Sequence, residues 1–481
     1  HLLSDLRKVH NGDLTTAMRE AVKQLRGSFT LLAVHADKPD LIVGVRRNSP
    51  LVVGLGDGEN FMASDVAAFI EYTKRAVELG QDEVVTITPT SISITDLAGN
   101  EIKPREYAIT WDAEAAQKGG FAHFMLKEIF EQPKAVADTL IGRLHGGKIA
   151  LDELNLTSTE IKNLKKIVVL ACGTAYHAGM VAKYAIEKWS HIPVEVELAS
   201  EFRYRDPIVD KETLVIAISQ SGETMDTLMA LRHAKEAGAK VLAICNTNSS
   251  TIPRESDAVI YTHAGPEIAV ASTKAFLTQV VATYLIGLYL GQVVGTLSER
   301  QIEALYNEML ELPAKIEQIL ETVEPLRELT RSFADSSSVL FLGRHVGYPV
   351  ALEGALKLKE LAYMHAEGFA GGELKHGPIA LIDQGTPVIA IVPNTHDHGL
   401  DEKMLSNIQE VRARGAKVIA IAAEGIEIPG AAHVIRIPSA PQLLQPVLAT
   451  VPLQVFAYEM AVTRGNDVDQ PRNLAKSVTV E

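Results

Sequence analysis

The chain has 481 residues, which is too long for a single hydrophobic core and predicts two to four domains. Hydrophobic residues make up 47% of the chain and charged residues 22%, the ordinary composition of a soluble globular protein. The 60 acidic residues outnumber the 46 basic ones, and the resulting net charge of −14 would repel a phosphate backbone, which argues against nucleic acid as a partner.

The beginning of the sequence has the apolar spacing of a helix, with leucines at positions 2, 3 and 6 and a valine at position 9. No secretion signal and no initiator Met precede this pattern, so we expect that the sequence covers only part of the protein. The two cysteines, Cys172 and Cys245, do not form a disulfide framework and fit a reducing cytoplasm.

Residues 1–111 are predicted to form a domain rich in β-strands. The stretch 84–97 alternates apolar and polar residues and leads into a turn at 98–100. Glycines at 54, 56 and 58 do not match the GxGxxG spacing of dinucleotide-binding proteins, so we predict a loop between strands there. Residues 112–157 are mostly polar with a helical pattern, and we predict that they connect this domain to the next.

Two segments, 158–300 and 330–465, repeat one pattern. Short β-branched runs alternate with amphipathic helical runs in both, which predicts parallel sheets with helices on both faces. VIAI occurs at 215–218 and 388–391, and GAKV occurs at 238–241 and 415–418. We therefore predict an internal duplication that yields two α/β domains of similar topology.

Three other segments need an interpretation. Residues 301–329 are predicted to be a connecting helix. The tail 466–481 has no helical period, and the plain interpretation of such a terminus is a disordered end. The run from 275 to 297 contains no charge and is long enough to span a membrane. Its Thr and Gln residues, and the lack of a second such run, favour a helix buried in a globular core and no membrane partner.

The most informative stretch is VIAISQSGET, residues 215–224, where a predicted buried strand runs into a cluster of hydroxyls. Ligands of parallel sheets bind at the carboxyl ends of strands, and a helix beginning after Thr224 would direct its free N–H groups at this loop. Ser219, Ser221 and Thr224 add donors, and Gly222 permits close approach, so the loop is predicted to bind a phosphate group.

Helix capping is the alternative interpretation of this loop, because Ser and Thr commonly cap helices. Capping requires one hydroxyl, whereas three surround Gly222. In the second copy of the repeat, the loop after VIAI is VPNTHDHG, so the fold itself does not require the hydroxyl cluster. The chain contains no GKS or GKT motif at this loop, which argues against a nucleoside triphosphate.

Several motifs together resemble one family. They are LACGTAYHAG, EFRYR, SQSGET, RESD, ASTKAF, ALEGALKLKE, GELKHGP and the terminal DQPRNLAKSVTVE. This set resembles the glucosamine-6-phosphate synthases, the isomerizing glutamine–fructose-6-phosphate aminotransferases, over about residues 120–481. ENFMASD and RRNSPLVVGLG resemble the later part of the family's N-terminal glutaminase domain.

The resemblance implies an α/β fold of two tandem SIS (sugar isomerase) domains, preceded by a partial, β-rich glutaminase domain of the Ntn type. It implies conversion of D-fructose 6-phosphate and L-glutamine to D-glucosamine 6-phosphate and L-glutamate, in the amino-sugar pathway that leads to UDP-GlcNAc. It also implies a cytoplasmic homodimer that requires no cofactor and no metal.

The resemblance also implies roles for individual residues. The substrate-binding set is Gly173, Thr174, Ser219, Gln220, Ser221, Thr224, Val270, Ser272 and Ala475. Residues 466–481 would be a C-terminal catalytic tail, in which Lys476 would form a Schiff base with C2 of the sugar. Glu360 would move a proton between C1 and C2, held in place by Lys357 one helical turn earlier. His376, which comes from the neighbouring subunit in the family, would open the sugar ring. At position 175 many members have Ser, and this chain has Ala.

Without the resemblance, these residues have plainer interpretations. Glu353, Lys357 and Glu360 would be an exposed, salt-bridged helix face, His376 a loop residue and Lys476 a solvated tail residue. Cys172 would be a strand-end residue, because the sequence places no base beside it. The patch His396-Asp397-His398 lacks further ligands at a recognisable metal-binding spacing.

The glutaminase chemistry of the family uses an N-terminal Cys, and this sequence has no Cys before position 172. We therefore expect the sequence as given not to hydrolyse glutamine, while its isomerase half should act on hexose 6-phosphates. Two alternatives stay open: a non-catalytic sugar-phosphate sensor built on paired SIS domains, and a fructosamine-phosphate deglycase. The set Glu360, His376 and Lys476 argues against the sensor, and residues 1–110 argue against the deglycase.

Overall fold

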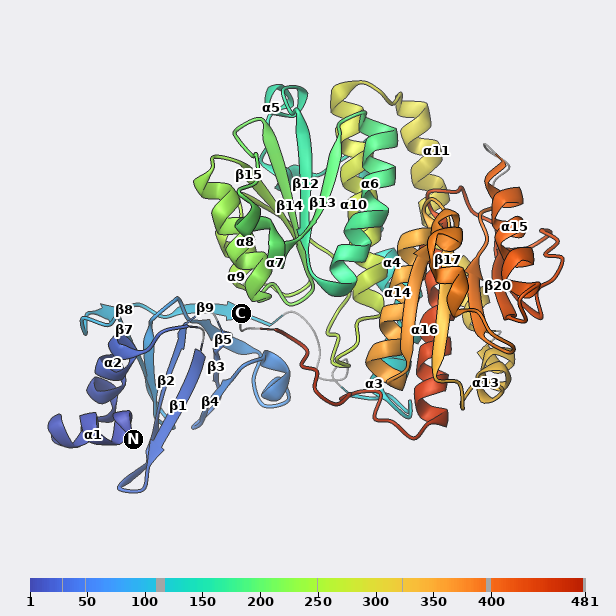
Figure 1. Cartoon of the computed structure of the whole chain (residues 1–481). Helices are drawn as coiled ribbons and strands as arrows, with labels where there is room; N and C mark the ends of the chain where they lie inside the picture. The colour runs from blue at the N-terminus through green and yellow to red at the C-terminus, as the bar shows by residue number, and fades with distance from the viewer. Residues whose placement is uncertain are drawn as a thin grey trace.

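The computed structural model describes residues 1–27, 29–47, 49–109, 117–248, 250–321, 323–394 and 399–478. Figure 1 shows a β-rich N-terminal domain beside two α/β domains that lie next to each other. The patch His396-Asp397-His398 lies outside the described residues.

The N-terminal domain contains two antiparallel sheets. One has the order β1-β2-β6-β7-β8 and the other β4-β3-β5-β9. Apolar side chains of both sheets, such as Val53 and Val85, share one buried cluster, so the sheets pack face to face. The strands are β1 (Phe29–His35), β2 (Lys38–Arg47), β3 (Val52–Leu55), β4 (Asn60–Ala63), β5 (Arg75–Glu78), β6 (Val84–Ile87), β7 (Ile92–Thr95), β8 (Glu101–Ile102) and β9 (Arg105–Ala108).

Two helices precede these strands. The expected helix at the beginning of the sequence is α1 (Leu2–Val9). The second helix, α2 (Leu14–Gln24), was not expected from the sequence, and its Leu14, Met18 and Val22 pack on the first of these sheets. The predicted loop is confirmed for Gly56 and Gly58, since β3 and β4 pair as a hairpin around residues 56–59, but Gly54 lies within β3 and pairs with Phe61.

The two α/β domains have the same sheet topology. The first parallel sheet has the order β13-β12-β14-β15-β16, and the second has the order β18-β17-β19-β20-β21. The VIAI repeats lie in β14 (Thr213–Ser219) and β19 (Pro387–Ile391), each one strand before its GAKV repeat in chain order. The identical order confirms the predicted duplication.

The remaining elements of the first α/β domain are β12 (Lys166–Ala171), α6 (Gly173–Ser190), β13 (Val194–Leu198), α7 (Ala199–Phe202), η4 (Arg203–Arg205), α8 (Met225–Glu236), β15 (Lys240–Cys245), α9 (Thr251–Glu255), β16 (Ala258–Tyr261) and α10 (Lys274–Val294). Those of the second are β17 (Ser338–Gly343), α14 (Gly347–Ala362), β18 (His365–Ala370), η5 (Gly371–His376), η6 (Pro378–Leu381), α15 (Leu400–Arg412), β20 (Lys417–Ala423), β21 (His433–Ile437) and α16 (Gln445–Thr463).

Short elements join the domains. Before the first parallel sheet they are α3 (Phe124–Phe130), α4 (Gln132–Leu140), β10 (Leu144–His145), β11 (Lys148–Ile149), η3 (Asp152–Leu154) and α5 (Ser158–Lys162), whereas η1 (Val66–Ala68) lies inside the N-terminal domain between β4 and β5. Where one connecting helix was expected, the structure has α11 (Glu299–Leu310), α12 (Leu312–Leu320) and α13 (Val323–Arg331).

The uncharged run forms α10, and the expectation that no second apolar run of this kind exists is wrong. By length and composition, both α10 and α16 could cross a membrane. Both are mostly buried inside the folded chain and share one hydrophobic cluster that spans the two α/β domains. These helices therefore have the surroundings of core helices.

Candidate active site

The SQSGET loop connects β14 to α8 at the carboxyl edge of the first parallel sheet. The buried hydroxyl of Ser219 accepts a hydrogen bond from the Gly222 amide at 3.0 Å and lies 2.9 Å from the Thr224 hydroxyl. Ser221 Oγ accepts a hydrogen bond from the Glu223 amide at 3.2 Å. The hydroxyl cluster thus stabilises the conformation of the loop at this edge of the sheet.

Gly222 occupies a position that excludes a side chain. Its φ of +67° lies in the left-handed region, and a β-carbon there would lie 2.0 Å from Ser250 Oγ. The loop can therefore close onto the segment that follows β15 only because residue 222 is glycine.

The C-terminal tail is packed on this loop, so its interpretation as a disordered end is wrong for the residues that are described. In Figure 1 the tail leaves the second α/β domain and runs toward the N-terminal domain and the first α/β domain. The Val478 carbonyl accepts a hydrogen bond from the amide of Met225, the first residue of α8, at 3.1 Å. The Asp469 carbonyl accepts one from the Val270 amide at 3.0 Å.

Lys476 is held by a buried carboxylate. Its Nζ donates to Glu267 Oε2 at 2.7 Å and to the Ala269 carbonyl at 2.8 Å. Glu267 Oε1 accepts from the amides of Thr273 and Ala275 at the start of α10. Burial opposes ionisation of Glu267, but the Lys476 ammonium and these donors hold the pKa of its carboxyl below the usual range.

A second buried carboxylate lies under the same segment. Glu128 Oε1 accepts hydrogen bonds from the amides of Ile268 and Ala269. Burial, followed by the charge of Glu267, raises the pKa of Glu128 to about 8. The Lys476 site therefore combines one ionised carboxylate with one that holds its proton near neutral pH.

A second cluster lies on α14 and contacts α6. Lys357 Nζ is 2.5 Å from Glu360 Oε2, 3.5 Å from Glu353 Oε1 and 2.9 Å from the Thr174 hydroxyl. Thr174 in turn donates to Glu353 Oε1 at 3.1 Å. The expected contact between Lys357 and Glu360 is therefore present, and Thr174 joins the two α/β domains. Glu353 and Lys357 are fully buried, so the interpretation as an exposed helix face is wrong.

The two clusters interact electrostatically. Despite its burial, the pKa of Lys357 is raised by Glu360 and Glu353, with a further contribution from Glu267. β12 and β14 are neighbours in the first sheet, so the loops at Thr174 and Ser219 lie at the same edge. The structure thus brings the SQSGET loop, the tail lysine and the α14 cluster to one region.

The other expected residues surround this region, with one exception. Gly173 begins α6, Ser272 Oγ is buried and without a hydrogen-bond partner among the described residues, and Ala475 is an exposed tail residue. The exception is His376, an exposed residue at the end of η5. In the described part of the chain, no hydrogen bond or ion pair connects His376 to the α14 cluster.

Cys172 lies beside this region as the residue before α6. Its Sγ contacts Thr227 Oγ1 at 3.8 Å, and burial raises the pKa of the thiol. A raised pKa disfavours the nucleophilic thiolate, in agreement with the interpretation of Cys172 as a strand-end residue.

A cavity of about 480 Å³ separates the N-terminal domain from the first α/β domain. Gln220, Ser221 and Lys476 line it from one side, and Arg46 and Tyr107 line it from the N-terminal domain. The expected substrate-binding loop and the tail lysine therefore have access to a space shared with the N-terminal domain.

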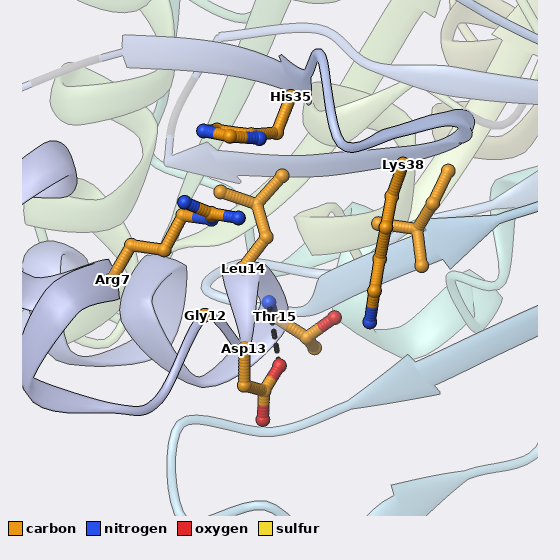
Figure 2. Close-up of a pocket in the computed structure, with 8 residues that line it drawn as sticks. Arg7, Gly12, Asp13, Leu14, Thr15, His35 and Lys38 are labelled. Carbon is orange, nitrogen blue, oxygen red and sulfur yellow. Dashed lines mark hydrogen bonds between the residues drawn. The ribbon is translucent and has the colours of Figure 1, made fainter.

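Figure 2 shows a much smaller cavity, of about 30 Å³, inside the N-terminal domain. Its lining includes Arg7, His35 and Lys38, and Asp13 there accepts a hydrogen bond from the Thr15 amide at 3.0 Å. None of the expected site residues lies in this cavity. Across the described ranges, His, Cys, Asp and Glu side chains do not form a group of three or more that could hold a metal ion.

The partners of the expected residues were not predicted from the sequence. These partners are Glu267 and Glu128 under the tail, His177 beside Glu353, and Arg46 across the domain interface. His177 lies inside the motif LACGTAYHAG, and Glu223, the partner of Arg46, lies inside SQSGET. Their positions inside these motifs were the sequence feature that could have identified them.

Comparison with known proteins identifies the family. The SIS domain family matches residues 160–289 and 332–464. The glutamine–fructose-6-phosphate aminotransferase (isomerizing) of Streptomyces coelicolor is 64% identical over 98% of this chain and 77% of its own length. The enzyme of the same name from Mycobacterium tuberculosis is 59% identical over 98% of this chain and 76% of its own length.

Solved structures agree with this assignment. The C-terminal domain of the glucosamine-fructose-6-phosphate aminotransferase from Francisella tularensis covers 74% of this chain and all of that chain, at 43% identity and a TM-score of 0.70. A tagatose-6-phosphate ketose/aldose isomerase from Escherichia coli, at 19% identity and a TM-score of 0.60 over 73% of this chain and 95% of that chain, shares the fold. This chain therefore belongs to the family of isomerizing glutamine–fructose-6-phosphate aminotransferases.

Proposed function

We propose that this chain carries the isomerase half of the conversion of D-fructose 6-phosphate and L-glutamine to D-glucosamine 6-phosphate and L-glutamate, without the Cys that releases the amide nitrogen of glutamine. The observation that supports this function most directly is the position of Lys476. The tail follows the second α/β domain in sequence but packs against the SQSGET loop of the first, the loop predicted to bind phosphate. Glu267 holds the Lys476 amine there.

The amine of Lys476 is the nucleophile toward the sugar ketone. After transferring its proton to a neighbouring base, Lys476 attacks C2, and the ketone oxygen leaves as water to give a Schiff base. Glu267, 2.7 Å away and ionised, is placed to accept that proton. Ammonia derived from glutamine then displaces the lysine, and the nitrogen stays on C2.

Glu360 carries out the aldose–ketose step. Its carboxylate takes a proton from C1 and returns it to C2, so that C1 becomes the aldehyde of glucosamine 6-phosphate. Lys357, 2.5 Å from Glu360, orients the carboxylate. The sugar phosphate binds at Ser219, Gln220, Ser221 and Thr224, with Gly173, Thr174, Val270, Ser272 and Ala475 around the sugar.

His376 acts across a subunit interface in a homodimer and opens the sugar ring. Its exposure at the end of η5, away from the α14 cluster, supports a role for it in a neighbouring copy of the chain. The domain formed by residues 1–111 is part of the glutaminase domain, and residues 158–300 and 330–465 are the two SIS domains. Two free cysteines support a cytoplasmic location.

The test is the isomerisation of hexose phosphates, because this step requires no glutamine. Purified chain supplied with glucose 6-phosphate should form fructose 6-phosphate. In deuterated water, the proton transfer between C1 and C2 should also incorporate deuterium from the solvent into the sugar. If the chain binds both sugars and neither isomerises nor exchanges them, it is a sugar-phosphate sensor and the proposed function is wrong.

A further inference from the structure

His177 lies in the second turn of α6 and contacts the α14 cluster. Thr174 and His177 are three residues apart, so they share one face of the helix. Both contact the carboxylate of Glu353: Thr174 donates to Oε1 at 3.1 Å, and His177 Nδ1 lies 2.7 Å from Oε2. One helix of the first α/β domain therefore holds both oxygens of a single carboxylate in the second.

That carboxylate depends on its partners because it is fully buried. A buried carboxylate oxygen left without a hydrogen bond costs free energy, and Oε2 has His177 as its partner. An ionised carboxylate only accepts, so the hydrogen of this contact belongs to His177 Nδ1. The contact therefore selects the imidazole tautomer that carries its proton on Nδ1.

Glu353 competes with Glu360 for the same cation. Lys357 Nζ is 3.5 Å from Glu353 and 2.5 Å from Glu360, so the ammonium is placed closer to Glu360. While His177 and Thr174 satisfy Glu353, the ammonium can stay at Glu360. Without His177, Oε2 of Glu353 would lose its donor, and the ammonium would move toward Glu353 and away from Glu360.

We propose that His177 is a positioning residue for the isomerisation step, acting through Glu353 and Lys357 on the carboxylate of Glu360. The chemistry it supports rests on the proposed function. His177 belongs to neither the SQSGET loop nor the tail, so sugar-phosphate affinity should be largely independent of it. The inference thus assigns His177 an effect on kcat and little effect on KM.

The test compares two substitutions in the full chain. His177→Asn keeps a donor for Glu353, whereas His177→Leu has similar size and no donor. In glucose 6-phosphate isomerisation, His177→Leu should lower kcat at least tenfold with KM within twofold of the wild type, and His177→Asn should recover most of the lost kcat. His365→Leu, on an exposed His of β18, is the matched control and should leave both constants unchanged.

Three outcomes would overturn the inference: wild-type kcat in His177→Leu, equal losses of kcat in the Asn and Leu variants, or an increase of KM with kcat unchanged. A second readout does not depend on activity. Chain labelled with ¹⁵N-histidine should show the Nδ1–H tautomer for His177, and the Nε2–H tautomer would contradict the inference. If the wild type is inactive while the Nδ1–H tautomer is present, the proposed function fails and the geometric basis of the inference stands.

Discussion

Arg46 of the N-terminal domain forms a buried ion pair with Glu223 of the SQSGET loop. The Nη2 to Oε2 distance is 3.2 Å, and the side chains are only 3% and 8% exposed. Thr251 connects the two, since it donates to Glu223 Oε1 at 3.0 Å and accepts from Arg46 at 2.8 Å. The acidic residue of SQSGET therefore contacts the N-terminal domain, while the hydroxyls of Ser219 and Ser221 form hydrogen bonds within the loop.

Removing Arg46 should destabilise the chain more than removing a neighbouring arginine. Arg46→Met leaves Glu223 buried without its cation, which costs about 3 kcal/mol and should lower the melting temperature by roughly 6 °C or more. A double-mutant cycle with Glu223→Gln, measured by thermal unfolding, should show coupling between the two sites. Arg47→Met is the control, because Arg47 pairs with Asp82 inside its own domain. Strict additivity of Arg46→Met and Glu223→Gln would contradict the pairing.

Gly222→Ala should disrupt the loop through two separable effects. The positive φ costs about 1 kcal/mol or more for any residue with a β-carbon. The clash with Ser250 Oγ adds to this cost and should displace the loop, so KM for the sugar phosphate should rise several-fold. Gly238→Ala is the control, because Gly238 has a φ of +92° and its nearest neighbour would lie 4.0 Å away. Equal losses of stability and affinity in both variants would show that the close approach of Ser250 is irrelevant.

Glu128 should make stability fall as pH rises through neutrality. The unfolded carboxyl loses its proton near the ordinary value of 4.5, whereas the folded one holds its proton up to about 8. Between these pH values the folded state binds more protons than the unfolded state, so the free energy of unfolding decreases with increasing pH. The lowered pKa of Glu267 acts only below its usual range and does not overlap this window.

Glu128→Gln should remove this pH dependence. Oε1 of the glutamine can still accept from Ile268 and Ala269, and the replaced Oε2 has no hydrogen-bond partner among the described atoms. Melting temperatures measured from pH 5 to 8.5 should decline less steeply in the variant than in the wild type. Parallel curves would mean that Glu128 is ionised throughout.

Lys476 should be the site of Schiff-base formation. Borohydride added with fructose 6-phosphate should give a stable adduct on the peptide that contains Lys476, detected by mass spectrometry. Lys476→Ala should abolish the adduct, and Lys403→Ala, on the exposed side of α15, should not. Undiminished trapping in Lys476→Ala would assign the nucleophile elsewhere. Glu267→Gln should slow trapping without abolishing it, because the amine then loses its proton acceptor.

His376 and Glu360 should complement each other across a dimer. His376→Ala and Glu360→Gln should each be nearly inactive in isomerisation. After the two variants are unfolded together and refolded as a mixture, half of the dimers should be mixed, and each mixed dimer has one intact site, so about a quarter of wild-type activity should return. Complete absence of recovery, with mixed dimers demonstrated by mass spectrometry, would place His376 and Glu360 of a site on one chain.

Several features of the fold could be predicted from local patterns. The duplicated VIAI and GAKV segments predicted two α/β domains, and the structure has the same strand order in both sheets. Such runs are read correctly because a buried parallel strand is apolar throughout, whatever surrounds it. The apolar stretch in α16 escaped detection because Pro452 and Glu459 interrupt it, and only burial against the other helices showed that it is a core helix.

The sequence alone was enough to identify the residues of each motif. These are an SQSGET loop at a strand end, a lysine in the terminal segment, and carboxylates on a helix of the second repeat. The tertiary structure alone decided which charges meet. The pairs Lys476–Glu267, Arg46–Glu223 and His177–Glu353 join residues that are 209, 177 and 176 positions apart. Periodicity and turn chemistry act over a few residues, whereas the partner of a buried charge depends on how whole domains pack. A local sequence pattern therefore does not identify that partner.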